Sequence, residues 1–380
     1  MTEEDGVKRH KSSLVEVVGL VVAGEEDLHF DPGRSSHEKP SRITSICKLL
    51  DLHKAEMNLV RIPSRMALDS ELLTVHSKQY LAKLHRLSQS LDHAECNLQA
   101  QEEFESIYMN KNSLLAAKLS AGSALTMLDA VFDHHPHLHR AAAAIRPPGH
   151  HAEHHCAMGF CFFNNAALVV KRALDVHSLA KVLIVDFDIH HGNATQRMFF
   201  NDDRVVYFSI HRWDRGKFYP AMGMEASPQV TGPSGKTVNV AFSDGEMGDL
   251  EYRAVVEAIL VPLVGEFSPE LVVFSAGFDV LHGDPIGRYH VSPQGLGCLV
   301  HHTLQAAVAT NQRSKAVLLL EGGYSNAATA EGFCACVKAM HSNSEGEEWP
   351  EFTLWPRTKP QALEAINATI AAHQKFWRSL

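Results

Sequence analysis

The chain has 380 residues, 45% of them hydrophobic and 21% charged, which is typical of a soluble globular protein and excludes a disordered or fibrous one. Its formal charge of −9 excludes the overall basic character of nucleic-acid-binding domains, and we expect no direct contact with nucleic acid. The 25 histidines are the less ordinary figure, since histidine serves both as a metal ligand and as an acid–base group near neutral pH.

The N-terminal segment lacks the features of a signal peptide, because Met1–Asp5 carries acidic residues in place of a basic region and an apolar run. No apolar run approaches the length of about 18 residues that a membrane helix needs, and the best candidate, Val15–Ala23, is interrupted by Glu16, so we expect no membrane contact. The seven cysteines form no C-x-x-C pair. Together these features predict a protein of a reducing intracellular compartment, the cytoplasm, the nucleus or both.

Short apolar runs alternate with longer helical patterns along the chain. The predicted strands are Val15–Val22, Ala143–Arg146, Val182–Asp186, Val205–Ile210, Thr237–Ala241, Leu271–Ser275 and Ala316–Leu320. The predicted helices are Ser113–Phe132, Asn164–Leu174, Asp249–Glu266, Pro293–Ala309, Ala327–Met340 and Leu363–Phe376. Apolar strands separated by helices indicate a parallel sheet covered on both faces. We therefore predict one α/β domain over residues 1–380, with a polar loop region at 341–361 and a C-terminal helix in 362–380 that packs back on the body.

Polar residues follow five of the predicted strands, at the edge where open parallel sheets bind their ligands. They are His150 and His151; Asp186, Asp188, His190 and Asn193; Ser209; Asp279; and Tyr324. The sequence thus predicts that these side chains meet in one site.

A metal site is the first chemistry that this set favours. Asp188 and His190 are two residues apart, so in an extended segment their side chains point the same way. Asp279, at another strand end, completes a set of one imidazole and two carboxylates, which suits zinc or another divalent ion with an open position.

The pair His150-His151 offers a general base beside that metal, with Asp186 and Asn193 as acceptors that orient the rings. Three other histidine groups in the chain are interpreted as exposed loop or helix residues without function. They are His134, His135, His137 and His139; His154 and His155; and His301 and His302.

Tyr324 follows two glycines directly after a buried strand, and its hydroxyl could donate to a carbonyl oxygen that gains negative charge. Phe160 and Tyr219 could line a narrow apolar channel, although aromatic residues near glycine and proline are more often part of a core.

Six segments together resemble the zinc-dependent histone deacetylases of class II, from about residue 37 to 340. They read R-P-P-G-H-H-A-E, G-F-C-F-F-N-N, V-D-F-D-I-H-H-G-N-A-T-Q, S-I-H-R-W-D, S-A-G-F-D…G-D-P-I-G and E-G-G-Y. The upstream segments H-E-K-P-S-R-I and F-E-S-I-Y fit as well. The phrase H-H-G-N, in place of H-H-G-D, is typical of class II, and the chain most resembles the tubulin-deacetylase-like class IIb and the plant class II members.

The resemblance implies an arginase-like, three-layer α/β/α fold with a central, mainly parallel sheet of about eight strands. It implies one zinc ion, held by Asp188, His190 and Asp279, and a structural potassium ion. The implied potassium ligands, partly main-chain oxygens, are Asp186, Asp188, His190, Ser209 and Ile210.

The resemblance also implies catalytic and substrate-binding roles. His150 and His151 match the histidine pair, with His151 as general base and acid. The positions implied for substrate are Gly159, which accepts from the amide, the tunnel walls Phe160 and Tyr219, the gatekeeper Ile286 and, at the rim, Ser106.

Several positions depart from the family pattern. Tyr219 stands where phenylalanine is common, and Ala194 where glycine is usual. Tyr324 argues against class IIa members, which carry histidine there. The polyamine-deacetylase branch has glutamate at the position of Ile286, so an acetylpolyamine substrate is disfavoured.

The leading hypothesis is hydrolysis of acetyl-lysine, or a related acyl-lysine, in proteins such as histones or tubulin, and the partner is an acetylated protein or peptide. A dinuclear manganese ureohydrolase is a second reading, but its second-metal aspartate is absent after His190. A third is a non-catalytic acyl-lysine-binding protein. The sequence leaves the acyl preference and any partner subunits open.

Overall fold

The computed structural model of the chain describes residues 17–23, 28–53, 57–133, 137–341, 348–349 and 357–380. Its centre is an eight-stranded sheet in the order β2-β1-β3-β8-β7-β4-β5-β6, and every strand pair in it is parallel. The strands are β1 Val17–Val22, β2 Leu59–Arg61, β3 Leu138–Ala144, β4 Val182–Asp186, β5 Val205–Arg212, β6 Thr237–Phe242, β7 Leu271–Ala276 and β8 Lys315–Leu320.

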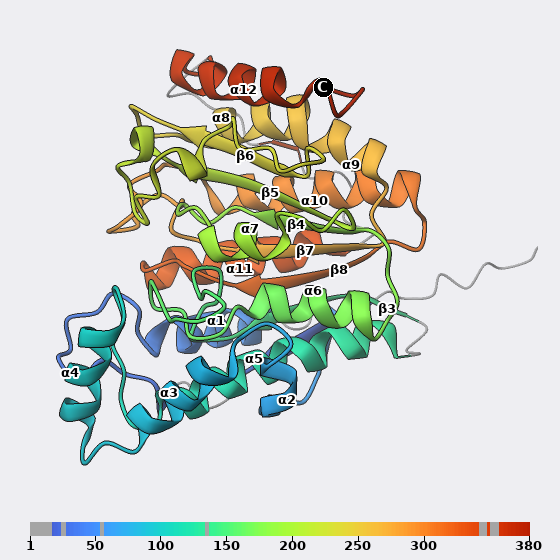
Figure 1. Cartoon of the computed structure of the whole chain (residues 1–380). Coiled ribbons are helices and arrows are strands. Elements are labelled where there is room, and N and C mark those ends of the chain that lie inside the picture. The colour runs from blue at the N-terminus through green and yellow to red at the C-terminus, as the bar shows by residue number, and fades with distance from the viewer. Residues whose placement is uncertain (1–16, 24–27, 54–56, 134–136, 342–347, 350–356) are drawn as a thin grey trace, which may run out of the picture.

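Helices cover both faces of this sheet, which gives the three expected layers (Figure 1). One face carries α1 Ser41–His53, α8 Asp249–Val255, α9 Val261–Phe267, α10 Pro293–Thr310 and α11 Asn326–Ala339. The other face carries α5 Ser113–Phe132 and α6 Asn165–Asp175, with α3 Lys78–Ser88 packed beside α5 and α4 His93–Glu103 packed on α3. The short helices α2 Asp69–Leu72 and α7 Asn193–Phe199 follow β2 and β4.

Alternation along the strands assigns their side chains to two hydrophobic cores. On β4, Leu183 and Val185 belong to the core under α1 and α8–α11, whereas Val182 and Ile184 belong to the core under α5 and α6. The α8–α9 segment is one continuous helix with a π-turn at Val256–Leu260. Strands buried on both faces explain why the sequence shows continuous apolar runs.

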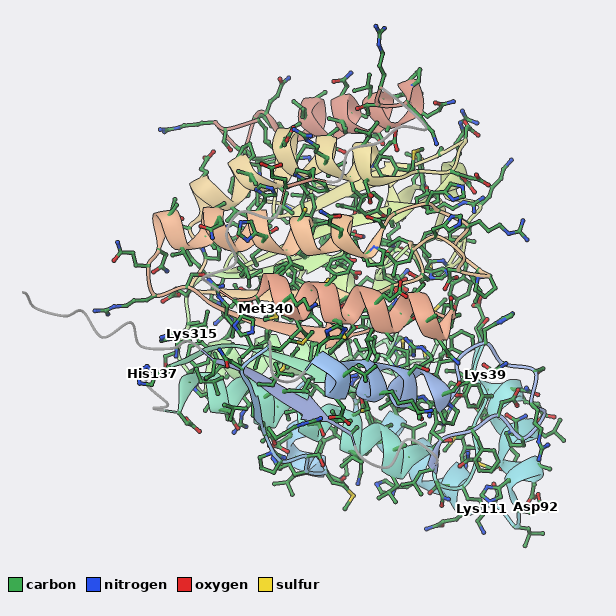
Figure 2. All side chains as sticks on the ribbon, turned by 180° about the vertical axis from the view of Figure 1, so that it is seen from behind. Lys39, Asp92, Lys111, His137, Lys315 and Met340 are labelled. Atoms are coloured by element: carbon green, nitrogen blue, oxygen red, sulfur yellow. The ribbon has the colours of Figure 1, made fainter. Side chains whose placement is uncertain are left out.

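Figure 2, seen from behind, shows the direction of the strands. Lys315 at the start of β8 and His137 just before β3 lie at one end of the molecule, and Lys39, just before α1, lies at the opposite end. The carboxyl ends of the strands therefore point toward the end that carries Lys39.

Most predicted elements are present with ends shifted by one or two residues, and the eight-stranded parallel sheet is confirmed. The strand expected at Ala143–Arg146 is displaced, because β3 runs over Leu138–Ala144 through four alanines that have little strand propensity. The edge strand β2 and the helices α1 to α4 and α7 were not predicted. The C-terminal helix α12, Pro360–His373, packs on β6.

The helix α5 corrects the expectation that no segment is long and apolar enough to span a membrane. Ser113–Phe132 meets that criterion by length and composition. In the structure most of the helix is buried, and it packs on β1, β3 and α6 as a core helix does.

Candidate metal and catalytic site

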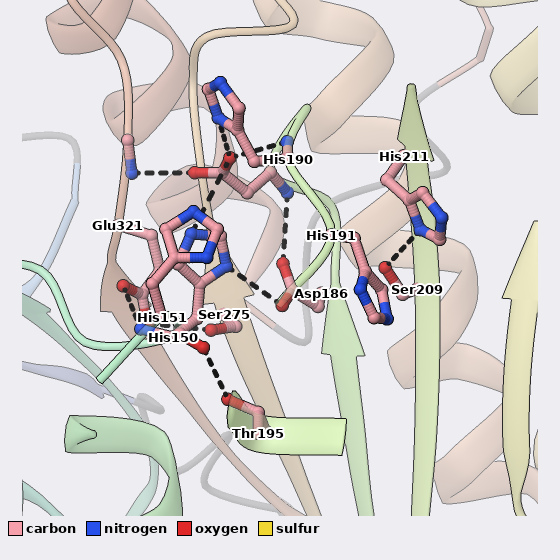
Figure 3. A network of polar contacts seen from close by, with 12 residues as sticks. His150, His151, Asp186, His190, His191, Thr195, Ser209, His211, Ser275 and Glu321 are labelled. Atoms are coloured by element: carbon pink, nitrogen blue, oxygen red, sulfur yellow. Dashed lines mark hydrogen bonds and ion pairs between the residues drawn. The ribbon is translucent and has the colours of Figure 1, made fainter. Parts of the chain in front are cut away.

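The loops after β3, β4, β5, β7 and β8 meet at the carboxyl end of the sheet. Asp186, the last residue of β4, pairs in register with Ser209 on β5 and with Ser275 on β7. Figure 3 shows His150, Asp186, His190 and Glu321 gathered around this point. The residues predicted from the strand ends are thus brought together by the topology of the sheet.

Asp188, His190 and Asp279 form one buried cluster whose ligand atoms all lie within 4.8 Å of one another. His190 Nδ1 lies 2.9 Å from Asp188 Oδ1 and 3.1 Å from Asp279 Oδ2. One imidazole nitrogen and two carboxylate oxygens at this spacing can hold a divalent metal ion.

The backbone fixes both carboxylates. Asp188 Oδ2 accepts from the amide of Gly322 at 2.9 Å, and Asp279 Oδ1 accepts from the amide of Ile189 at 2.9 Å. A Cβ on Gly322 would lie 2.4 Å from Asp279 Oδ2 and 2.5 Å from Asp188 Oδ2, so only glycine leaves room for both. Among the described residues, nothing makes a well-formed hydrogen bond to Asp279 Oδ2, which leaves this oxygen available to a metal ion.

The charges in the cluster also fit a cation. Burial and the Asp188 carboxylate raise the pKa of Asp279 to about 7. Although burial opposes it, the His150 and His190 charges hold the pKa of Asp188 below its usual value. Two carboxylates this close in a buried place repel each other, and a divalent cation relieves that repulsion.

His150 and His151 are each 3% exposed, and their ring centroids are 4.0 Å apart. His150 Nδ1 lies 3.2 Å from Asp186 Oδ2, and His151 Nδ1 lies 2.7 Å from Asn193 Oδ1, which are the expected partners. Although burial opposes protonation, the Asp188 and Asp186 carboxylates raise the pKa of His150 to about 10. Burial and the neighbouring His150 and His190 charges lower the pKa of His151, so one ring is poised as a cation and the other as a base.

Glu321 holds the loop that carries the two histidines, and it was not predicted. Its Oε2 accepts from the amides of Gly149 at 2.6 Å and His150 at 3.2 Å, and Ser275 Oγ donates to its Oε1 at 2.8 Å. The residue is fully buried after β8. From the motif E-G-G-Y the sequence predicts a role only for Tyr324, yet Glu321 fixes the loop that carries His150 and His151.

The aromatic residues lie beside the cluster as expected. Tyr219 makes edge contacts with His151 and His190, at centroid distances of 5.3 and 5.8 Å, and Phe160 contacts Tyr324 at 5.9 Å. Phe160 has a φ of +67°, which turns the chain sharply after Gly159. Gly159 has a φ of +53°, and a Cβ there would lie 2.6 Å from the ring of His151 and 2.9 Å from the hydroxyl of Tyr219.

The hydroxyl of Tyr219 is buried and has no hydrogen-bond partner in the part of the chain that the structure describes. Burial and the Glu105 carboxylate raise the pKa of the Tyr219 phenol. The nearby Ser106 hydroxyl opposes that shift, but among the described residues no group forms a well-aligned hydrogen bond with the Tyr219 hydroxyl. The departure from phenylalanine at this position thus places an unpaired polar atom beside Gly159.

Ser106 and Ile286 lie further out. Ser106 is exposed, and its carbonyl accepts from the amide of Phe160 at 3.0 Å. Ile286 is half-buried, and its amide donates to Asp284 Oδ1 at 2.8 Å. Asp284 Oδ2 accepts from the amide of Tyr324 at 2.7 Å, so this carboxylate ties the Ile286 loop to the tyrosine.

Arg42, from the segment H-E-K-P-S-R-I, supports Tyr324 from behind. Its Nε donates to the carbonyl of Gly323 at 2.6 Å, and its Nη2 donates to the carbonyl of Glu321. The guanidinium lies 5.5 Å from the centroid of the Tyr324 ring. Glu38 neutralises this cation at 3.0 Å and also binds the buried Arg146. The sequence alone does not show that the charged residue Arg42 is fully buried.

The residues implied for potassium lie together but serve other contacts as well. Ser209 and Ile210 are fully buried on β5 next to Asp186, and Ser209 Oγ lies 2.9 Å from His211 Nδ1.

Two of the histidines that were expected to be exposed loop or helix residues differ from that expectation. His301 is only 6% exposed in α10, and His139 lies on β3, although its side chain is exposed as predicted. His154 and His155 are exposed. His134 and His135 lie outside the described residues.

Comparison with known proteins identifies the family. A family model described as "Histone deacetylase domain" matches residues 36–340. The chain belongs to the histone deacetylase family. The match covers every site residue discussed above, and the resemblance drawn from the motifs is confirmed.

Several curated proteins are similar to this histone deacetylase family member. Histone deacetylase 6 of Caenorhabditis elegans is 35% identical over 364 residues, which cover 93% of this chain and 38% of that protein. Polyamine deacetylase HDAC10 of Homo sapiens is 36% identical and Histone deacetylase 18 of Arabidopsis thaliana 37% identical, each with 51% of its length covered. The chain thus spans about half or less of the length of these relatives.

A solved structure supports the same fold. The crystal structure of the HDA15 HD domain superposes with a TM-score of 0.81 at 28% identity, covering 96% of this chain and 97% of that one. The arginase/deacetylase fold expected from the sequence is confirmed.

Proposed function

We propose that this chain hydrolyses acetyl-lysine, or a related acyl-lysine, in proteins such as histones or tubulin, with one zinc ion held by Asp188, His190 and Asp279. The observation that carries the proposal is the convergence of this buried ligand set with the His150-His151 pair and Tyr324. Family membership and the names of the relatives support deacetylation.

A zinc ion bound by Asp188, His190 and Asp279 would supply a Lewis acid for a water molecule and for the acyl carbonyl. His151 accepts the proton of the attacking water at Nε2 and returns it to the departing lysine amine. Burial and the Asp279 and Asp188 carboxylates raise the pKa of Tyr324, so its hydroxyl stays protonated and donates to the acyl oxygen as negative charge develops. Gly159 accepts from the substrate amide, between Phe160 and Tyr219.

A protein lysine is favoured over an acetylpolyamine, although two relatives are named polyamine deacetylases. The further ammonium groups of a polyamine need a counter-charge near the mouth, and Ile286 offers none there. The proposal includes a structural potassium ion beside Asp186, since Asp186 and Ser209 are paired neighbours on β4 and β5.

The test is acyl hydrolysis by the purified protein on acetyl- and longer acyl-lysine peptides and on acetylspermidine, with zinc counted per chain. Tyr324→Phe should lower kcat by about 10²–10³, as the loss of an oxyanion donor does. Tyr252→Phe is the matched control, because Tyr252 is a buried tyrosine on α8 and its hydroxyl has no partner among the described residues.

Four results would overturn the proposal. Near-full turnover by Tyr324→Phe contradicts the assigned mechanism. Peptide binding without acetate release indicates a non-catalytic acyl-lysine reader, and two manganese ions per chain indicate a ureohydrolase. Turnover of acetylspermidine above that of every peptide would replace the proposed substrate class.

A further inference from the structure

The Glu153 carboxylate contacts Asn193, the residue that binds His151 of the catalytic pair. Glu153 follows the two histidines in the loop after β3 and is 8% exposed. Its amide donates to the carbonyl of Cys156 at 2.9 Å, and its own carbonyl lies 2.9 Å from His76 Nδ1. The backbone is therefore fixed on both sides of the residue, and its side chain enters the site in a set direction.

Helix α7 presents two donors to this carboxylate. Asn193 is the first residue of α7 and Arg197 lies one turn further on, so both side chains point the same way. Asn193 Nδ2 and Arg197 Nη1 each donate to Glu153 Oε1 at 2.6 Å. Arg197 is held in turn by Glu225, through two bonds of 2.5 Å.

These contacts decide which end of the Asn193 amide faces the catalytic ring. A primary amide can present either its oxygen or its nitrogen, but a carboxylate only accepts. Glu153 thus requires Nδ2 on its own side, and Met158 Sδ, 3.8 Å from Nδ2, is also an acceptor. The oxygen Oδ1 is left to face His151 Nδ1 at 2.7 Å, and that nitrogen must carry the proton.

We propose that Glu153 is a positioning residue, which fixes the Asn193 amide and thereby the tautomer of His151 that leaves Nε2 free to accept a proton. This inference rests on the proposed function. If the amide were reversed, Nδ2 would donate to His151 Nδ1, and the ring proton would move to Nε2, which then could not act as a base. An aspartate at position 193 would need no such help, because both of its oxygens accept.

The wrong tautomer is costly. In serine proteases, replacing the aspartate that orients the catalytic histidine with asparagine lowers kcat by about 10⁴ at unchanged geometry. Here the loss of Glu153 frees the amide to sample both directions, so we expect a smaller fall, of about tenfold or more.

Two variants of similar size test whether Glu153 acts through its acceptor oxygen or only through the packing of its side chain. Glu153→Gln keeps an oxygen for Asn193 and Arg197, and since Arg197 only donates, it keeps that oxygen in place. Glu153→Met fills the same space without this acceptor. We expect Glu153→Gln to keep kcat within about threefold of wild type, and Glu153→Met to lose about tenfold or more in kcat with KM within about threefold.

The deciding arm adds Asn193→Asp to Glu153→Met. The carboxylate of Asp at position 193 accepts in either orientation, so kcat should rise by about fivefold or more above Glu153→Met. A purely structural role for Glu153 predicts no such recovery. If Glu153→Met does not fold, as judged by its melting curve, Glu153→Leu takes its place in both arms.

Wild-type kcat in Glu153→Met, or no recovery in the double variant, would overturn the inference. An inactive wild-type protein would instead overturn the proposed function, so the two failures are distinguishable.

Discussion

Removal of the Tyr219 hydroxyl should stabilise the protein. The oxygen is buried and has no hydrogen-bond partner among the described residues, and burying an unpaired hydroxyl costs about 1–3 kcal/mol. Tyr219→Phe deletes this atom and keeps the ring contacts with His151 and His190. We therefore expect the free energy of unfolding to rise by about 1–3 kcal/mol. The entropy of unfolding grows with chain length, and for a chain of this size that gain corresponds to about 1–4 °C in Tm.

The matched control is Tyr80→Phe. Tyr80 is 1% exposed, and its hydroxyl donates to the carbonyl of Phe162 at 2.7 Å. The same chemical change there removes a bond and strands a buried carbonyl, so it should destabilise by about 1–3 kcal/mol. Urea unfolding followed by circular dichroism measures both variants. Destabilisation of Tyr219→Phe to the level of Tyr80→Phe would show that the Tyr219 hydroxyl has a partner and would refute the reasoning.

Three further predictions concern buried charges and close contacts. Arg146→Met removes bonds of 2.7 and 2.6 Å to the buried Glu38 carboxylate, so urea unfolding should show a loss of about 3 kcal/mol or more, and a loss below 1 kcal/mol would contradict it. Burial lowers the pKa of His76 to about 4, below its unfolded value of about 6.5, so only the unfolded state takes up a proton as the pH falls through this window. From pH 6.5 to 5, wild type should lose about 1.5 kcal/mol more stability than His76→Asn, and parallel pH profiles would count against this. Gly322→Ala places a Cβ 2.5 Å from Asp188 Oδ2, so the purified variant should retain less than a tenth of the wild-type metal by elemental analysis. Full metal content in this variant would show that the carboxylates can move to make room for the methyl group.

The sheet was predictable because its strands are buried on both faces. Continuous runs such as Val182–Asp186 leave few alternatives to a parallel strand. By contrast, β3 contains four alanines, which have little preference for strands, and its position is set by pairing with β1 and β8. Helix α4 was missed because only Cys96 and Ala100 of its residues are buried, so it has almost no apolar stripe.

The candidate site was predictable where its residues follow a strand. Asp188 and His190 are two residues apart in an extended segment, and Asp279 and Tyr324 lie in the loops that follow β7 and β8. Glu153 could not be found in this way, since an acidic residue in a loop is usually solvated. Glu321 directly follows β8, but its position alone does not show that it binds the backbone of the opposite loop. The roles of both glutamates depend on backbone amides and on an arginine one helical turn away, contacts that exist only once distant segments have come together.

The strand order sets a condition on how the protein is made. β3 and β8 are neighbours in the centre of the sheet, yet β8 begins roughly 170 residues after β3 ends. A ribosome that adds about 5–20 residues per second needs on the order of ten to thirty seconds to cover that interval. During this time the edge of β3 that pairs with β8 has unpaired backbone N–H and C=O groups, and the segment carrying Glu321 and Tyr324 has not been synthesised. The nascent chain therefore exposes a strand edge that can aggregate until β8 has been made.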